Sequence, residues 1–405
     1  MADIQVSPVA DDTQSTPTSG ARLDVWTTHL IGYSFYARSN VGINGSIYYV
    51  KTTDGGQTWG ASTKVNSTTE EAGATQRFSV YYDQWTPGIS TTKIHIAWLE
   101  RIGVGVTYEA PIKYRALDTS NDSLGTEVQV TLLACGSGLC GNAARVSIVR
   151  SRGADLYIHN TATTVIRSTD DGATWPTATS VFAQGRLLPG GEIDPSDILL
   201  IETDAADLTY RIFDASAQTW SSSGVIDTSV NATAIQAEGA TRKSDNHKFV
   251  AYQLNKTGST KDLRVIEITI GTTWTQLTNV FTNEADHSHT ISANQVALAV
   301  DQFNTDHIYV GYGGIVGDAT QQGFKKSVDG GVTWGAQQVF GEDTVTGREG
   351  IFLAMNTSLV GGRIYGTWQV VANRDIFGNF ANSIALQSIN SRRRVGFGGY
   401  HAVRM

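Results

Sequence analysis

One short group of residues in this chain has side chains that could hold a metal ion, Asp286-His-Ser-His289. Imidazole nitrogens and carboxylate oxygens are common metal ligands. A polar loop with two exposed histidines would have the same composition, and we adopt this second interpretation. The Gly-x-Ser-x-Gly, P-loop and His-Glu-x-x-His motifs are absent from the sequence. The sequence therefore predicts no metal site and no cofactor.

The two cysteines, Cys135 and Cys140, stand in one loop with four residues between them. A small loop disulfide and two free thiols are both compatible with this spacing, because sequence alone does not fix the geometry of a disulfide. No histidine lies beside them, so they do not form a zinc ligand set.

A basic run, Ser391-Arg-Arg-Arg394, opens a terminal segment that continues with glycines and aromatic residues as far as Tyr400. Two interpretations stay open for residues 391–405: a solvated tail, or an arm that docks on an acidic partner, since arginine is favoured in charged interfaces.

Composition excludes several classes of protein. The net charge is −8, and charged residues make up 17% of the 405 positions, against a usual value of about 25%. A mainly electrostatic nucleic-acid binder would be basic. No apolar run is long enough to cross a membrane, and residues 1–20 lack the pattern of a secretory signal peptide. We therefore expect no nucleic-acid partner, no membrane insertion, and a virion or cytoplasmic location before assembly, with an extracellular one also open.

Short alternating strand patterns dominate the chain, and one phrase follows such a pattern three times. The copies are Lys51-Thr-Thr-Asp-Gly-Gly-Gln-Thr-Trp59, Arg167-Ser-Thr-Asp-Asp-Gly-Ala-Thr-Trp175 and Lys326-Ser-Val-Asp-Gly-Gly-Val-Thr-Trp334. All three match Ser/Thr-x-Asp-x-Gly-x-Thr-Trp. The phrase resembles the Asp-box, the bacterial neuraminidase repeat of sialidases and of many other propeller proteins. The resemblance implies an all-β propeller built from four-stranded antiparallel blades.

Each phrase is predicted to be a folding device in the turn between the third and fourth strands of a blade. The glycine can adopt a positive φ, and the aspartate can accept hydrogen bonds from backbone N–H groups of its own turn. The tryptophan is expected to begin the outer strand and cover the turn. The residues given these structural roles are Asp54, Gly56, Trp59, Asp170, Gly172, Trp175, Asp329, Gly331 and Trp334.

Weaker copies of the phrase complete a period of roughly 45 to 65 residues, which is typical of a propeller. Asp214 and Trp220 mark one copy, Thr269 and Trp274 another, and a further strand ends at Asp118. With a last strand set after residue 350, we count seven units and prefer seven blades, although sialidase domains have six. The predicted organisation is a polar N-terminal arm (1–21), a propeller (22–390) and a C-terminal arm (391–405).

The resemblance also implies where a sialidase site would lie. Sialidases clamp the substrate carboxylate with three arginines, and a Glu activates a Tyr nucleophile. The nearest matches are Arg22, Glu238 and Arg242, with Arg363 or Arg348 as the third arginine and Tyr365 as the nearest tyrosine. None of these residues lies in the sequence motif that sialidases have at that position. Arg22 is not followed by Ile-Pro, and Glu238 lies only four residues from Arg242. Strand-end or surface arginines are the interpretation we adopt.

Three functions remain open. The first, slightly preferred, is a non-enzymatic structural or binding propeller, such as a bacteriophage tail, fibre or decoration protein that forms homo-oligomers or binds other virion proteins through its arms. The second is an exo-sialidase or related glycoside hydrolase. The third is a glycan-binding, lectin-like propeller, since aromatic and amide side chains suit sugars.

Overall fold

The protein is represented by a computed structural model. The structure describes residues 4–7, 13–15, 23–39, 44–67, 70–71, 77–100, 108–135, 146–160, 164–180, 185–190, 194–204, 207–228, 237–255, 261–270, 273–284, 296–302, 305–315, 318–339, 348–353, 355–356, 364–370 and 376–381.

The described strands form seven sheets, numbered here 1 to 7 in chain order. Sheet 1 contains β3 (Asp24–Trp26), β4 (Gly32–Ser39), β5 (Asn44–Thr52) and β6 (Thr63–Lys64). Sheet 2 contains β8 (Arg77–Tyr82), β9 (Lys93–Leu99), β10 (Tyr108–Asp118) and β11 (Ser123–Leu124). Sheet 3 contains β13 (Val146–Arg150), β14 (Leu156–Asn160), β15 (Thr164–Ser168) and β16 (Thr177–Ser180).

The remaining four sheets have the same order. Sheet 4 contains β17 (Gly185–Pro189), β18 (Ile198–Asp204), β19 (Asp207–Asp214) and β20 (Thr219–Trp220). Sheet 5 contains β22 (Ala237–Thr241), β23 (Lys248–Asn255), β24 (Lys261–Ile270) and β25 (Thr273–Gln276). Sheet 6 contains β27 (Val296–Val300), β28 (Ile308–Ile315), β29 (Asp318–Ser327) and β30 (Gln338–Val339). Sheet 7 contains β31 (Arg348–Leu353), β33 (Ile364–Val370), β34 (Ile376–Ala381) and β1 (Ile4–Ser7).

Six short strands extend these sheets at their margins. They are β2 (Thr13–Ser15) on β4, β7 (Glu70–Glu71) on β5, β12 (Val128–Cys135) on β10, β21 (Gly224–Asp227) on β19, β26 (Phe281–Glu284) on β24, and β32 (Met355–Asn356) on β3. The β3–β32 pairing is parallel. Helical structure in the described ranges is limited to η1 (Asp83–Trp85), a 3-10 turn, and no described helix is long and apolar enough to span a membrane.

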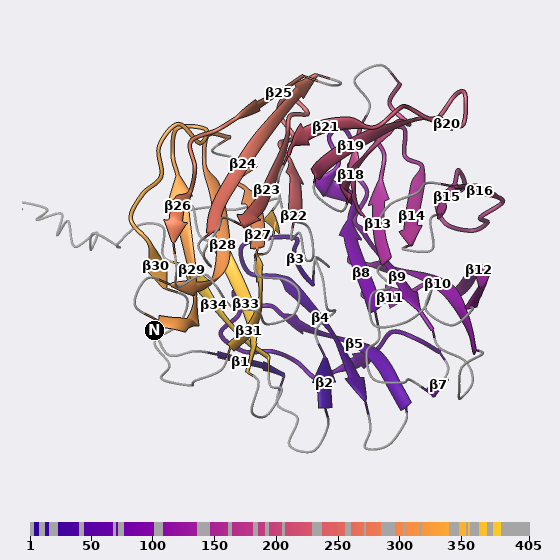
Figure 1. Ribbon diagram of the computed structural model, residues 1–405. Coiled ribbons are helices and arrows are strands. Elements are labelled where there is room, and N and C mark those ends of the chain that lie inside the picture. The colour runs from indigo at the N-terminus through magenta and orange to yellow at the C-terminus, as the bar shows by residue number, and fades with distance from the viewer. Residues whose placement is uncertain are drawn as a thin grey trace, which may run out of the picture.

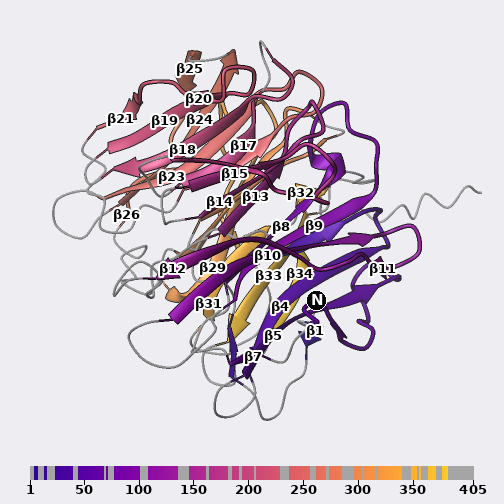
Figure 2. The same cartoon turned by 90° about the vertical axis from the view of Figure 1, so that its right-hand side faces the viewer.

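The sheets are arranged as a β-propeller with antiparallel blades of four core strands, as the phrase resemblance implies. Successive inner strands contact one another from β8 through β13, β17, β22 and β27 to β31, and β3 contacts β8 and β32. The chain therefore runs around a common axis, and its last sheet lies beside its first (Figures 1 and 2).

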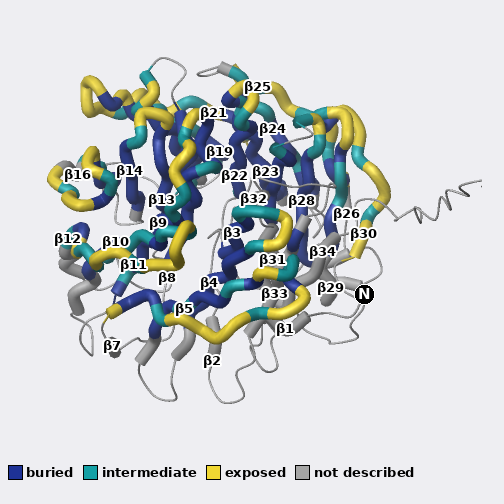
Figure 3. The backbone as a smooth tube through the Cα atoms, turned by 180° about the vertical axis from the view of Figure 1, so that it is seen from behind, coloured by how far each residue is buried: buried dark blue, intermediate teal, exposed yellow. Residues whose placement is uncertain are grey.

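The inner and middle strands are buried on both faces, because each sheet is covered by a neighbour on either side. All five residues of β13 and of β27 are buried, and the exposed segments are mostly connections and outer strands (Figure 3). The sequences of such strands are nearly continuous apolar runs, without strict alternation of apolar and polar residues. The main core that results extends through sheets 1 to 6, with aromatic residues such as Trp85, Trp98 and Tyr157 among its largest buried side chains.

The three phrases form equivalent turns between the third and fourth strands of sheets 1, 3 and 6, as predicted. In the first, Asp54 Oδ1 accepts hydrogen bonds from the backbone N–H groups of Gln57 (2.9 Å) and Thr58 (3.0 Å). Its Oδ2 accepts one from the Thr58 hydroxyl (2.6 Å). These bonds, led by the Thr58 hydroxyl, lower the pKa of Asp54 to about 2. The predicted positive φ is found at Gly56 (79°), Gly172 (88°) and Gly331 (90°).

The tryptophans of the phrases pack on the preceding sheet, which the sequence did not predict. Trp59 lies 5.9 Å from Tyr365 of sheet 7, and Trp175 lies 5.2 Å from Tyr114 of sheet 2, both between ring centroids. Trp334 Nε1 donates to the carbonyl of Thr278 in sheet 5, at 2.7 Å. The outer strands begin two to four positions after each tryptophan. The expectation that the tryptophan starts the outer strand is therefore wrong, and its role is to join neighbouring sheets.

The predicted N-terminal arm, residues 1–21, contributes two strands to the propeller. Ile4–Ser7 pairs with β34 as the outer strand of sheet 7, and Thr13–Ser15 pairs with β4 of sheet 1. Backbone pairing explains this difference, because it needs no apolar side chains and a polar segment can provide it. The predicted C-terminal arm (391–405) and the loop Asp286–His289 lie outside the described residues, as does Cys140.

Candidate functional site

The two ends of the propeller differ, and the chain topology shows which residues lie at each. In every sheet the first and third strands end at the same end of the molecule, because neighbouring strands are antiparallel. The three phrases follow third strands, so they lie at this end, which we call the lower end. The inner strands therefore begin at the opposite end, which we call the upper end.

Charged residues stand at the start of four inner strands. Arg77 is the first residue of β8, Arg186 the second of β17 and Glu238 the second of β22, while Arg348 and Glu349 open β31. Since the inner strands surround the axis, these positions are distributed around its upper end. These strand-start positions, with the described side chains of Arg186 and Glu238, define the candidate functional site, which we call the upper charged ring.

Arg186 and Glu238 are the two members of this ring whose side chains are described. Arg186 Nη2 lies 3.4 Å from Glu238 Oε2, and this ion pair joins sheet 4 to sheet 5. Their side chains are 13% and 10% exposed. A guanidinium offers parallel hydrogen bonds to a carboxylate or sulfate group, and a carboxylate can accept or donate a proton. The pair therefore combines an anion-binding group with a group capable of acid–base chemistry.

The structure does not bring Glu238 and Arg242 together, because they lie toward opposite ends of one strand. At about 3.3 Å per residue, four positions along β22 separate their backbones by roughly 13 Å. Arg242 Nε donates to both carboxylate oxygens of Asp245 (3.0 Å each), and Nη2 donates to Glu267 (2.9 Å). Its Nη1 donates to the carbonyl of Thr305 in sheet 6 (3.2 Å). Arg242 thus ties two sheets together at the lower end.

Tyr365 is fully buried in an aromatic cluster at the lower end. Its ring centroid lies 4.8 Å from that of Trp26 and 5.9 Å from that of Trp59. Burial, together with the charge of Asp24, raises the pKa of Tyr365 well above its usual value, so the nucleophilic phenolate is hard to form. Of the five residues that the sialidase resemblance suggested, Glu238, Arg242 and Tyr365 do not converge, and Arg22 and Arg363 lie outside the described residues.

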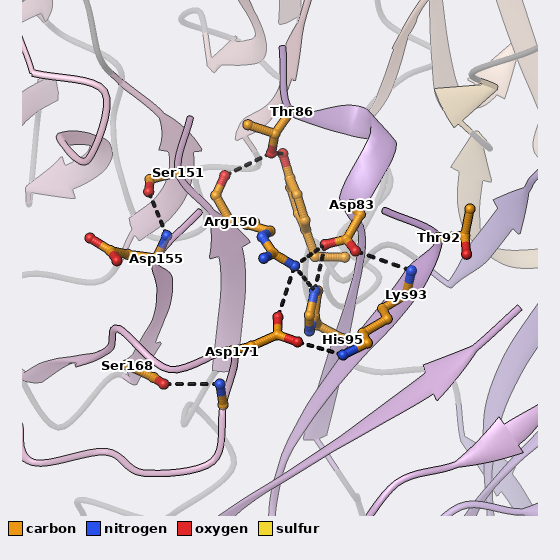
Figure 4. A network of polar contacts seen from close by, with 12 residues as sticks. Asp83, Thr86, Thr92, Lys93, His95, Arg150, Ser151, Asp155, Ser168 and Asp171 are labelled. Atoms are coloured by element: carbon orange, nitrogen blue, oxygen red, sulfur yellow. Dashed lines mark hydrogen bonds and ion pairs between the residues drawn. The ribbon is translucent and has the colours of Figure 1, made fainter. Parts of the chain in front are cut away.

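A second cluster of titratable groups lies at the lower end, between sheets 2 and 3 (Figure 4). His95 Nε2 lies 2.6 Å from Asp83 Oδ1, and its Nδ1 lies 2.8 Å from the Tyr114 hydroxyl. Arg150 Nη1, from sheet 3, donates to Asp83 at 2.7 Å and lies 3.0 Å from Asp171 Oδ1.

This lower cluster resembles a catalytic arrangement in its residue types but is closed to substrate. Asp83 and His95 are 0% exposed, and Arg150 is also buried. Burial alone would raise the pKa of Asp83, but His95 and Arg150 hold it well below its usual range. Desolvation and the charges of Asp171 and Asp83 raise the pKa of Tyr114. We therefore interpret the lower cluster as an ion network that joins two sheets.

The upper charged ring was only partly visible in the sequence. Glu238 and Arg348 were considered for the sialidase role, whereas Arg77 and Arg186 were missed. Their signal is positional: each arginine immediately precedes the apolar run that opens a repeat, as in Arg77-Phe-Ser-Val-Tyr-Tyr82. No group of three or more His, Cys, Asp or Glu side chains in the described ranges is arranged to hold a metal ion.

Solved structures share the fold over almost the whole chain. A polysaccharide lyase, ulvan lyase of family PL25, solved bound to -[GlcA(1-4)Rha3S]-, has 12% identity and a TM-score of 0.57 over 92% of this chain and 95% of its own. An α-L-arabinofuranosidase from Fusarium graminearum has 12% identity and a TM-score of 0.52, over 94% and 97%. The NanB sialidase from Streptococcus pneumoniae has 11% identity and a TM-score of 0.47, over 93% and 69%. No protein-family model and no curated protein matches the sequence. The ulvan lyase and the arabinofuranosidase therefore share the β-propeller fold of this chain.

Proposed function

We propose that the protein binds an anionic glycan at the upper end of the propeller and cleaves it. The observation that carries the proposal is the Arg186–Glu238 ion pair at the upper end, where Arg77, Arg348 and Glu349 also occupy strand-start positions. Arginines around one axial end suit a ligand with carboxylate or sulfate groups.

The fold supports a glycan as the ligand. A chain of similar length and topology, the ulvan lyase, was solved with a polysaccharide that contains a uronate and a sulfated sugar. Propellers of this likeness also include an arabinofuranosidase. Fold alone does not imply function, so the proposal rests on the charged residues at the strand starts. The structural likeness to the ulvan lyase then indicates a glycan as the class of ligand.

Glu238 is the group to which we assign acid–base chemistry. A glutamate beside an arginine can hold a proton-transfer position while the arginine binds the charged group of the sugar. This assignment favours glycan cleavage over the non-enzymatic virion component that the sequence first suggested. A virion or lectin-like protein would use the same ring for binding alone.

The test measures binding and cleavage separately. Uronate- and sulfate-containing polysaccharides, neutral arabinan and xyloglucan, and a fluorogenic sialoside are offered to the protein. Binding is followed by calorimetry, and cleavage by new reducing ends and by absorbance of unsaturated uronates. We expect the anionic polymers to bind and be cleaved and the neutral ones not.

Three variants locate the activity. Arg186→Gln is expected to weaken binding at least about tenfold, as loss of a charged hydrogen-bond partner costs roughly 1.5–3 kcal/mol. Glu238→Gln is expected to reduce cleavage more than binding. Arg152→Gln removes the same charge from an exposed residue at the lower end and is expected to change neither. Equal binding of neutral and anionic polymers, or an unchanged Arg186→Gln protein, would contradict the proposal. Binding without cleavage would favour the lectin-like alternative.

We also infer that each of the seven sheets is one blade and that the three phrases are Asp-boxes. The succession of inner-strand contacts supports the first inference. The same aspartate–threonine and serine/threonine–glycine hydrogen bonds in all three turns support the second. An experimental structure with fewer than seven radial sheets would contradict the blade count.

A further inference from the structure

Two aspartates at the lower end adopt a backbone conformation that L-residues rarely use. Asp122 and Asp171 both have a φ of 59°. In the first and third phrases the position that corresponds to Asp171 is Gly55 and Gly330, with φ of 74° and 70°. Glycine adopts this left-handed region at no steric cost, whereas most other residues are strained there and aspartate is tolerated more readily than most. A position that would suit glycine therefore holds a charged side chain instead.

Asp171 uses its carboxylate to join sheet 3 to sheet 2. Its Oδ2 forms an ion pair with Lys93 at the start of β9, and its Oδ1 lies 3.0 Å from Arg150. Its backbone carbonyl accepts a hydrogen bond of 3.5 Å from the hydroxyl of Tyr114 in β10. The turn that carries Asp171 is packed so closely on Tyr114 that a Cβ at Gly172 would lie 2.2 Å from that ring.

Asp122 makes the same kind of connection one boundary earlier. It lies in the turn between β10 and β11 of sheet 2, at the same end as the phrases. Its Oδ1 accepts a hydrogen bond of 2.6 Å from the hydroxyl of Tyr33, and its Oδ2 lies 2.6 Å from Lys51 Nζ. Both partners belong to sheet 1. In each case a left-handed aspartate binds one lysine and one tyrosine of the preceding sheet.

These two ion pairs are more exposed than the ion pairs between sheets 4 and 5. The side chains of Asp122 and Asp171 are 41% and 37% exposed, whereas Arg264 and Asp227, which join sheets 4 and 5, are 17% and 16% exposed. Salt screens exposed pairs much more than buried ones. The boundary between sheets 1 and 2 should therefore respond most to ionic strength. The boundary between sheets 2 and 3 should respond in part, because the exposed Lys93–Asp171 pair lies there beside the buried Arg150–Asp83 pair. The boundary between sheets 4 and 5 should respond least.

We propose that Asp122 and Asp171 are two salt-sensitive latches that clamp sheet 2 between sheets 1 and 3. We then expect sheet 2 to open more readily than sheet 5 as ionic strength rises. The strain of two left-handed aspartates persists because each carboxylate links neighbouring sheets. The inference concerns the lower end and does not depend on the proposed glycan site.

Hydrogen exchange measured by mass spectrometry tests the latches. In the unmodified protein, peptides covering β9 and β10 should exchange roughly two- to fivefold faster at 1 M salt than at 0.05 M, the range expected for exposed ion pairs. Peptides covering β23 and β24 of sheet 5 serve as the internal reference and should change little. Equal salt responses in sheets 2 and 5 would overturn the proposal.

Variants separate the ion pair from the backbone strain. Asp171→Gly and Asp122→Gly remove both, and we expect faster exchange in sheet 2 at low salt together with loss of the salt response. Lys93→Gln and Lys51→Gln leave the turns intact and should act in the same direction. The matched control is Gly330→Asp, which has room for a Cβ and should not introduce a salt response in sheet 6. Slower or unchanged exchange in both the glycine and the glutamine variants would refute the latches.

Discussion

At the scale of single residues, a small hydroxyl side chain determines the geometry of each phrase turn. Ser168 is fully buried, and its Oγ accepts a hydrogen bond of 3.0 Å from the backbone N–H of Gly172 while donating one of 2.8 Å to Asp170. Thr52 and Ser327 make the same pair of bonds in the other two phrases. The hydroxyl thus fixes both the glycine and the aspartate of the turn.

Replacing Ser168 by alanine should destabilise the protein by about 1–3 kcal/mol, because the buried N–H of Gly172 loses its partner. Equilibrium denaturation in urea measures this change. Ser221→Ala is a suitable comparison, since that hydroxyl belongs to an exposed residue, and its loss should cost less. Equal stability of Ser168→Ala and the parent would contradict the role of the hydroxyl.

The phrase residues could be assigned from the sequence because their chemistry is local. Asp54, Gly56 and Thr58 interact within one turn, so residue type and spacing suffice to predict their bonds. The contact between Trp175 and Tyr114 could not be predicted in this way, because it joins residues from different sheets. The same reason explains why the sequence could not show that the sialidase candidates Glu238 and Tyr365 lie at different ends of the fold.

At the scale of elements, the end of β13 is held against sheet 2 by both charge and backbone. Arg150 Nη1 contacts Asp83 at 2.7 Å, and the carbonyl of Arg150 accepts a hydrogen bond of 2.7 Å from Thr86. Asp83 is the first residue of η1, which follows β8 directly, and Thr86 is the residue after its end. An inner strand and the turn of the preceding sheet are therefore joined at two points.

Substituting Arg150 by methionine should cost roughly 3–5 kcal/mol, because it leaves the charge of Asp83 buried with one partner fewer. Thermal and urea unfolding are the measurements. The double variant Arg150→Met with Asp83→Asn is the control, and it should recover part of the loss because the unpaired charge is gone. A double variant no more stable than Arg150→Met alone would contradict this account.

At the scale of the whole molecule, the propeller is completed by its own N-terminal segment. The outer strand of sheet 7 is Ile4–Ser7, paired with residues 376–378 of β34. The order of strands in this sheet therefore combines the first and the last described parts of the chain. Composition and repeat spacing predicted a propeller correctly, but they placed this polar segment outside it because its pairing uses only backbone groups.

Removing residues 1–7 should lower the melting temperature, because β34 would become an unpaired edge and lose its ladder of hydrogen bonds. Differential scanning calorimetry measures the shift. Removal of residues 1–3 alone, which leaves Ile4–Ser7 in place, is the control and should have little effect. A melting temperature unchanged by the longer truncation would show that β1 contributes nothing to stability.

The pairing of β1 with β34 has a consequence for biosynthesis. The strand Ile4–Ser7 finds its permanent partner, β34, only after more than 360 further residues of the chain have been made. Until then the nascent chain is an open arc with unprotected edges at both of its ends, and such edges invite association with other chains. Chains truncated before residue 376 should therefore aggregate, while the chain that includes β34 should stay in solution.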